Sequence, residues 1–349
     1  MRVYMYGLLA FAGLLVAACG KDYPGMGELL PGDVSGEGTS HWYYSYEAAR
    51  LIGAEELGMG AAEDFTPNAV AHVGDTLFIA NMGQAGHSLL VYGLGEERLL
   101  RTVKSWTAGG AERGFGSPIE AIVPAGDRLY VAERQSRIHV FRLPGLEYVT
   151  CIGNGQWSGP VFQAQAVAVT GGLVFARDKD GKVSVYREAD ATPENDQKVN
   201  RYRQASGNGS PGNNGFAPHT MTLDAEGHIL LTDYEGKKIR VLDPALVNDG
   251  FENGGVIDRD DLALALDFKP KTLALTAERW YATGDNNAVN IYDCRRGVWV
   301  KQLKSVKGYA FSQPERIYAQ SDSVFWVSDV HKNKRTLVKM VAYKGEIRE

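Results

Sequence analysis

Short runs of alternating apolar and polar residues fill the chain from about residue 65 onward, with Gly, Pro, Asn or Asp between them. A period of two predicts β-strands that bury one face, joined by tight turns. In one clear example, Met221 and Leu223 precede a turn at 224–227, and an apolar run then leads to Asp233. Because an isolated hairpin is at best marginally stable, we expect it to pack against neighbouring hairpins.

This hairpin pattern recurs six times along the chain. Five of the six copies begin with Pro, which is best tolerated at the first residue of a strand because it lacks an N–H. A third apolar strand follows each hairpin, and weaker fourth strands are expected at 98–106, 146–153 and 297–305. The six copies span 67–81, 118–133, 165–178, 218–233, 270–285 and 314–329.

The spacing of the copies predicts the fold class. A small residue ends the second strand of each copy, at intervals of about 50 residues: Ala80, Ala132, Ala176, Thr232, Thr283 and Ser328. Six units of this length, each a four-stranded antiparallel sheet, predict an all-β, six-bladed β-propeller. The last blade is short of a fourth strand, which could come from 346–349 or from the aromatic segment at 42–46. We favour the tail, 346–349.

One copy resembles a known repeat family. Residues 218–243 read "PHTMTLDAEGHILLTDYEGKKIRVLD", which resembles an NHL repeat, and the Gly-rich run at 206–218 resembles its inter-blade loop. The resemblance covers 65–349; it is good in the second and fourth copies and degenerate in the third, fifth and sixth. It implies a six-bladed, NHL-like propeller.

The N-terminus has the pattern of a signal peptide. Arg2 precedes an apolar run that ends at Ala18, which is short of the roughly 20 residues of a spanning helix. The sequence Val16-Ala17-Ala18-Cys19 resembles the lipobox of bacterial lipoproteins, in which the signal is removed and the cysteine is acylated, for example with palmitate. The residue after the cysteine is Gly20, and in this respect the sequence resembles lipoproteins that are sorted by default to the outer membrane. The alternative is an ordinary secretory signal with an incidental cysteine.

These patterns divide the chain into four parts. We predict a lipoprotein signal peptide at 1–18, a flexible tether rich in Gly, Pro and acidic residues at 19–40, an N-terminal segment docking on the propeller at 41–64, and the six-bladed propeller at 65–349. Within 41–64, the aromatics at 42–46 could form a strand or a carbohydrate platform, and "YEAARLIGAEEL" could form a short helix. We favour packing over a platform for these aromatics.

Charge and cysteine content restrict the function further. A formal charge of −5 argues against nucleic-acid binding, which needs a basic surface. Cys151 and Cys294 fall in the second and fifth copies, on opposite sides of a six-membered ring. A disulfide needs Cα atoms within about 7 Å, so we expect two free thiols.

Short motifs that suggest chemistry fit turns and loops better. The GxGxxG match at 207–212 precedes a strand rather than a helix, so it predicts a loop rather than a phosphate site. The acidic runs at 178–182 and 233–237 recur at one position of the repeat, which favours hairpin turns over a calcium loop. The basic run at 331–335 is expected at a solvated hairpin tip. No HExxH, GxSxG or SxxK motif occurs.

The strongest candidate site is the mouth of the central channel, where loops of all six blades converge. The first strands would contribute Asn68, Glu120, Gln165, His219, Lys271 and Glu315. The ends of the second strands would contribute Asn81, Glu133, Arg177, Asp233, Asp285 and Asp329. The alternative explanation is that strand ends simply favour such polar residues.

Two functional classes remain open. The first is a non-enzymatic binding or scaffold module, anchored to the envelope by lipid, that binds a partner protein, glycan or small ligand without a cofactor. The second is a hydrolase of sugar lactones or esters with Ca²⁺ or another divalent ion at the mouth, held by Glu120, Asn68, His219 and Asp233. Some six-bladed propellers of that kind are similar, but their motifs do not match this chain residue by residue. We favour the first class.

Overall fold

A computed structural model of the protein describes residues 28–30, 40–61, 64–84, 86–156, 163–178, 182–205, 220–294 and 297–348. The chain divides into two compact units. The larger unit is Ala48–Val341, and the smaller combines Met1–Glu47 with Ala342–Glu349. The predicted signal peptide, Cys19 and the motif at 207–212 lie outside the described residues, as does His219.

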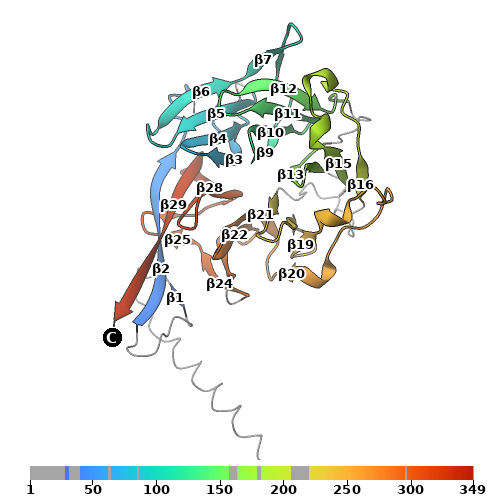
Figure 1. The fold of residues 1–349 in the computed structure, drawn as a ribbon. Coiled ribbons are helices and arrows are strands. Elements are labelled where there is room, and N and C mark those ends of the chain that lie inside the picture. The colour runs from blue at the N-terminus through green and yellow to red at the C-terminus, as the bar shows by residue number, and fades with distance from the viewer. Residues whose placement is uncertain are drawn as a thin grey trace, which may run out of the picture. The chain divides into compact units, whose positions relative to one another are not determined.

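The larger unit consists of six antiparallel blades arranged around a common axis (Figure 1). Blade one contains β3 (Pro67–Val73), β4 (Thr76–Asn81), β5 (Ser88–Gly93) and β6 (Arg98–Val103). Blade two contains β9 (Ile119–Ala125), β10 (Arg128–Glu133), β11 (Arg137–Arg142) and β12 (Glu147–Ile152). Blade three contains β13 (Ala166–Thr170), β14 (Leu173–Arg177), β15 (Val183–Arg187) and β16 (Arg203–Ala205).

The remaining blades follow the same order. Blade four contains β17 (Met221–Leu223), β18 (Ile229–Asp233), β19 (Lys238–Leu242) and β20 (Leu264–Ala265). Blade five contains β21 (Pro270–Leu275), β22 (Arg279–Gly284), β23 (Val289–Asp293) and β24 (Val298–Leu303). Blade six contains β27 (Arg316–Ala319), β28 (Val324–His331), residues 334–341 of β29 (Lys334–Arg348) and residues 48–52 of β2 (Ser40–Ile52). The predicted six-bladed fold of four-stranded blades is therefore confirmed.

Short elements connect the blades. The connections include two hairpins, β7 (Ser105–Ala108) with β8 (Ala111–Gly114) and β25 (Ser305–Val306) with β26 (Tyr309–Ala310). Among the described residues, four 3₁₀ turns lie within blades, between the third and fourth strands: η2 (Glu188–Asp190) and η3 (Pro193–Asn195) in blade three, and η4 (Pro244–Leu246) and η5 (Asp260–Leu262) in blade four.

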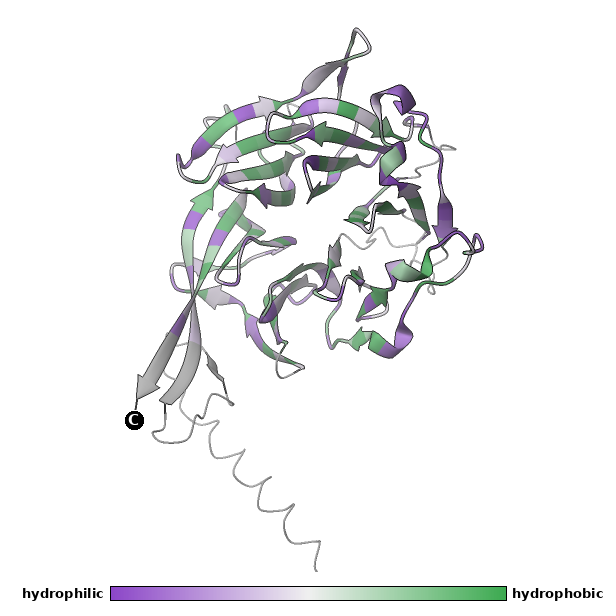
Figure 2. Cartoon of the chain, in the orientation of Figure 1, coloured by the Kyte–Doolittle hydropathy of each residue, from purple (hydrophilic) through white to green (hydrophobic). Residues whose placement is uncertain are grey.

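The core consists of apolar layers between neighbouring blades, because each blade is a sheet with two faces to cover. Hydrophobic residues accordingly follow the blade strands, and hydrophilic residues gather in the turns (Figure 2). Buried pairs at the six interfaces are Phe78 and Leu129, Tyr130 and Val174, Phe175 and Leu231, Leu230 and Leu273, Tyr281 and Phe325, and Trp326 and Leu77.

The small residues that end the second strands are all buried at 3% exposure or less. Two of them bond directly to the next blade. The Thr232 hydroxyl donates to the Lys271 carbonyl at 3.2 Å, and the Thr283 hydroxyl donates to the Glu315 carbonyl at 2.8 Å. A larger side chain at these positions would displace the neighbouring first strand, which explains why the sequence keeps them small.

The prediction that residues 346–349 form the fourth strand of blade six is wrong, because β2 occupies that position. Residues 346–348 continue β29 and do not form a separate strand. The outer neighbour of β29 is β2, which precedes blade one in the chain. Within the larger unit, Ile52 packs with Leu77 of blade one and Trp326 of blade six, so this segment joins the first blade to the last.

Several smaller predictions are also confirmed. Lys332 and Asn333 form the two-residue turn between β28 and β29, so the basic run at 331–335 is a hairpin tip. The Asp233 carboxylate accepts the Gly236 N–H at 2.8 Å, as expected of a turn. Cys151 and Cys294 are both free thiols.

The smaller unit contains a short antiparallel ladder. β1 (Glu28–Leu30) pairs with β2 in the register Glu28↔Tyr44, Leu29↔Tyr43 and Leu30↔Trp42. The side chains of Tyr44 and Tyr46 are buried, in agreement with a packing role. The part of the chain that the structure describes holds no helix with the length and apolar character needed to cross a membrane.

Candidate ligand-binding channel

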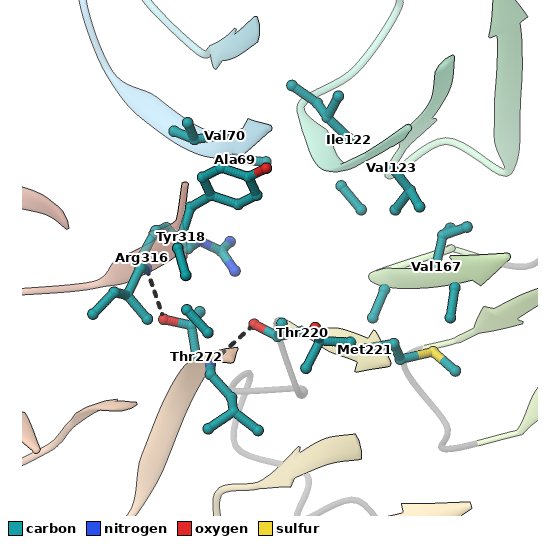
Figure 3. A pocket seen from close by; sticks show the side chains of 18 of the residues that line it. Ala69, Val70, Ile122, Val123, Val167, Thr220, Met221, Thr272, Arg316 and Tyr318 are labelled. Carbon is teal, nitrogen blue, oxygen red and sulfur yellow. Dashed lines mark hydrogen bonds between the residues drawn. The ribbon is translucent and has the colours of Figure 1, made fainter. Parts of the chain in front are cut away.

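A cavity of about 310 Å³ lies where the first strands of the six blades meet. It is lined by residues of β3, β9, β13, β17, β21 and β27, so every blade contributes. Most lining side chains are apolar, for example Val70, Ile122, Val167 and Met221 (Figure 3). The channel is therefore a mainly apolar compartment into which a few polar groups project.

The polar groups gather where β3, β9 and β27 begin. Asn68 donates from Nδ2 to Glu120 Oε2 at 3.1 Å, and Arg316 donates from Nη2 to Asn68 Oδ1 at 2.7 Å. Arg316 Nη2 also lies 3.3 Å from Glu120 Oε2, and Arg134 Nε donates to Glu120 Oε1 at 2.7 Å. We call Asn68, Glu120, Arg134 and Arg316 the polar cluster.

The polar cluster carries a surplus of positive charge. The side chain of Glu120 is 2% exposed and contacts two guanidinium groups, whereas Arg134 is 54% exposed. Burial lowers the pKa of Arg316, and the nearby carboxylate of Glu120 acts in the opposite direction. A carboxylate held by two arginines is a poor ligand for a cation, because the guanidinium charges repel the incoming ion.

Further polar side chains line the channel away from the cluster. The Tyr318 hydroxyl accepts the His72 N–H at 3.0 Å, and burial raises the pKa of Tyr318. The Thr272 hydroxyl accepts the Ile317 N–H at 3.0 Å. Figure 3 shows Arg316 and Tyr318 projecting from β27 toward the cavity.

The structure brings together some of the first-strand candidates. Asn68 and Glu120 line the cavity and bond to each other. Lys271 and Glu315 are not among the lining residues, and Glu315 pairs with Arg335 at 2.7 Å. Gln165 is also outside the lining, although its N–H donates to the Arg177 carbonyl at 2.9 Å.

The second-strand candidates have a different role in four blades. Each side chain accepts the N–H of the residue just before the Pro that opens the first strand of its own blade. The bonds are Thr66 N to Asn81 Oδ1 at 2.8 Å, Ser117 N to Glu133 Oε2 at 3.3 Å, Lys269 N to Asp285 Oδ1 at 2.9 Å, and Gln313 N to Asp329 Oδ1 at 2.5 Å. These side chains therefore anchor the incoming loops, which explains why acceptors recur at this position.

The other two second-strand candidates also lie outside the cavity lining. Asp233 bonds within its own hairpin turn. Arg177 is 4% exposed, and burial, together with the charge of Arg240, lowers its pKa to about 10. Neither residue contributes to the polar cluster.

The sequence reasoning did not identify Arg316 and Arg134. Arg316 follows the chosen position, Glu315, by one residue, and it pairs across the ladder with Ser328. First strands begin irregularly: blades one, two and five each have a register shift there. A register shift changes which side chain faces the channel axis. The alternation of apolar and polar residues therefore does not tell which of two consecutive residues points into the channel. The sequence did hold one signal for Arg316: it is a charged residue directly before the apolar run Ile317–Ala319.

The fold and cavity define an all-β, six-bladed propeller with a partly polar central channel. No protein-family model matches the chain, and no curated protein matches its sequence. Among solved structures, it is similar to the Myceliophteria thermophila Cps50 (Swd1) β-propeller domain, with 12% identity, 85% of this chain and 99% of that chain covered, and a TM-score of 0.53.

A second similar structure is a structural-genomics protein of unknown function from Bacteroides thetaiotaomicron VPI-5482. The identity is 14%, the alignment covers 86% of this chain and 76% of that chain, and the TM-score is 0.59. At these identities the similarity concerns the fold alone.

Proposed function

We propose that the protein is a lipid-anchored binding protein of the cell envelope, and that its channel takes a small ligand. The ligand would have an apolar body and an acceptor group, such as a carbonyl or carboxylate, that faces the polar cluster. The observation that carries the proposal is the mainly apolar cavity of about 310 Å³ with Asn68, Glu120 and Arg316 at its lining. Mostly apolar pockets with a few placed polar groups are typical of small-molecule sites.

The anchoring part of the proposal rests on the sequence. The pattern at 1–19 supports export and acylation of Cys19, and Gly20 supports sorting to the outer membrane. Two or more acyl chains give stable membrane attachment, whereas one chain gives only marginal binding. The net charge of −5 agrees with a ligand or partner other than nucleic acid.

The contacts of Glu120 and Asp233 do not support the hydrolase alternative. Its metal set needs Glu120 as a ligand, and Glu120 is bound by Arg134 and Arg316. It also needs Asp233, whose carboxylate bonds to its own turn. Neither arrangement favours a divalent ion at the channel mouth.

The channel can be tested with a blocking substitution. Ala319 lines the cavity and is half-buried, so Ala319→Phe should fill space without disturbing a packed core position. Ala310→Phe is the matched control, because Ala310 is exposed on β26. The measurement is saturation-transfer NMR with a fragment set of aromatic and aliphatic carboxylates, amides and methyl glycosides.

We expect fragments with an apolar body and an acceptor group to bind the wild type. Their affinity should fall by about ten-fold or more in Ala319→Phe and stay unchanged in Ala310→Phe. Binding that is equally strong in both variants would remove the channel as the site. A set in which no fragment binds would contradict a small-molecule role for the cavity.

A further inference from the structure

A second cavity, of about 210 Å³, lies beside blade two and apart from the channel. It is lined by Arg113 and Gly114 of β8, Arg137 and His139 of β11, Cys151 of β12, and Gln197, which follows η3. No residue of this lining also lines the channel. The two cavities are therefore separate sites.

His139 is the unusual residue of this cavity. It is 3% exposed, and neither ring nitrogen has a hydrogen-bond partner among the residues that the structure describes. Its Nε2 lies 3.5 Å from Glu133 Oε1, beyond a good hydrogen bond. A buried imidazole whose nearest polar partner is Glu133 at 3.5 Å would gain free energy from a bound group that offers it a closer hydrogen bond.

The ring of His139 is held in place by aromatic neighbours. Trp106 meets it edge-to-face with ring centroids 4.7 Å apart, and Phe115 does so at 5.6 Å. These contacts fix the imidazole plane without using its nitrogens. The imidazole, which lines the cavity, is thus held mainly by aromatic packing.

The cavity is rich in hydrogen-bond donors. Arg113 and Arg137 each have five N–H groups, and each pairs with one carboxylate: Arg113 with Asp196 at 2.6 Å, and Arg137 with Glu133 at 2.9 Å. The carboxylate oxygens of Asp196 and Glu133 accept further hydrogen bonds from other groups of the protein. Asp196 also accepts from Tyr148 Oη at 2.5 Å and Cys151 N at 3.0 Å.

Glu133 is similarly occupied, because its second oxygen accepts the N–H groups of Gly116 and Ser117 at 2.9 and 3.3 Å. The carboxylate oxygens are therefore largely used by the protein, while Arg113, Arg137 and His139 line one small space. Arg113 also donates to Tyr148 Oη at 3.3 Å and to the side-chain oxygen of Gln197, which leaves part of its set of N–H groups for a ligand. A planar group that offers two acceptor oxygens matches this donor set.

We propose that this cavity binds a small carboxylate, held by the guanidinium groups of Arg113 and Arg137 with His139 beside it. The volume admits a molecule of a few carbon atoms. The charges of Glu133 and Asp196 balance those of the two arginines, so a single carboxylate should bind with about millimolar affinity. The proposal does not depend on the function proposed for the channel.

The test is isothermal titration of the full chain with sodium acetate at constant ionic strength. Acetamide is the control ligand, because it has a similar shape and no charge. We expect acetate to bind and acetamide to bind at least about ten-fold more weakly. No acetate binding at about 50 mM, or equal binding of the two, would overturn the proposal. Binding of inorganic phosphate in place of acetate would also overturn it, by assigning the cavity to phosphate.

Two substitutions locate the binding. His139→Phe keeps the ring packing and removes both nitrogens. If His139 only packs, acetate affinity should change little, whereas we expect it to fall several-fold. Arg113→Gln should weaken acetate by about ten-fold, whereas Arg98→Gln, on the exposed part of β6, should not. Ala319→Phe should leave acetate binding intact, which separates this site from the channel. Acetate affinity unchanged in both His139→Phe and Arg113→Gln would place the binding elsewhere.

Discussion

At the scale of single residues, Glu133 shows how one buried carboxylate holds a blade and its incoming loop together. The residue is fully buried, and its two oxygens accept from Gly116, Ser117 and Arg137. Burial by itself raises the pKa of Glu133, but the adjacent His139 and the hydrogen bond and charge of Arg137 outweigh it, so the pKa lies below its usual value. Folding therefore favours the ionised form.

The sign of this shift gives a prediction for Glu133→Gln. Because the pKa is lower in the folded state, ionised Glu133 contributes stability above the unfolded-state pKa of about 4.3, and this contribution is lost as pH falls through the folded value. We expect Glu133→Gln to lower the free energy of unfolding by about 2–4 kcal/mol at pH 7, since charge-assisted bonds are lost. The difference from wild type should shrink in acid.

Urea denaturation at pH 7 and at about pH 3.5 measures both effects. Glu147→Gln is the control, because Glu147 is exposed at the start of β12. A Glu133→Gln variant as stable as Glu147→Gln at pH 7 would contradict the anchoring role.

At the scale of elements, blade six depends on a strand from the other end of the larger unit. Ile52 of β2 is fully buried and shares a cluster with Leu77 and Trp326. The Ala48 N–H also donates to the Lys307 carbonyl at 3.1 Å, which attaches β2 to the β25–β26 hairpin. The segment 48–52 thus completes a sheet and covers an interface at the same time.

This packing predicts a large effect for Ile52→Ala. Truncating a fully buried aliphatic side chain costs about 2–5 kcal/mol, because it removes contacts and leaves a cavity. Leu100→Ala is the matched control: Leu100 lies on the outer strand of blade one and is 41% exposed, so its loss should cost less than about 1 kcal/mol. Chemical denaturation measures both, and equal losses would mean that β2 does not seal this interface.

The elements also show why part of the fold could be predicted and part could not. The first three strands of blades one to five follow from local hairpins, in which each turn fixes the pairing of adjacent strands. The fourth strands of blades three and four, β16 and β20, come after long connections and were not expected from the sequence. The closure of blade six is non-local, and residues 46–57 read as a possible helix because Ala, Glu, Leu and Arg favour helices. The ladder with β29 overrides that preference through Ile52.

The repeat pattern also identifies only some of the residues that line the channel. Asn68 and Glu120 could be found from the repeat, because they follow the opening Pro of their copies. Arg316 could not, because the irregular starts of the first strands make the inward position uncertain by one residue. The cavity beside blade two gave no sequence signal, since Arg113, His139 and Gln197 come from three separate elements.

At the scale of the whole molecule, the proposed membrane attachment would depend on a single side chain, Cys19, which lies outside the described residues. We expect Cys19→Ser to release the protein from membranes, because acylation requires the thiol. Fractionation of cells that express each variant measures the membrane-bound share. Cys294→Ser is the control, since Cys294 is a free, half-buried thiol of blade five. Full retention of Cys19→Ser in the membrane fraction would refute the lipobox interpretation.

The position of residues 48–52 has a consequence for biogenesis. A ribosome completes this segment long before it makes residues 334–341, against which the segment pairs in the finished protein. During synthesis, Leu77 is made soon after Ile52, whereas Trp326 and Leu337 are made near the end. The apolar surface around Ile52 and Leu77 is therefore uncovered through most of the synthesis of the chain. A chaperone that covers this surface would act before blade six closes the ring.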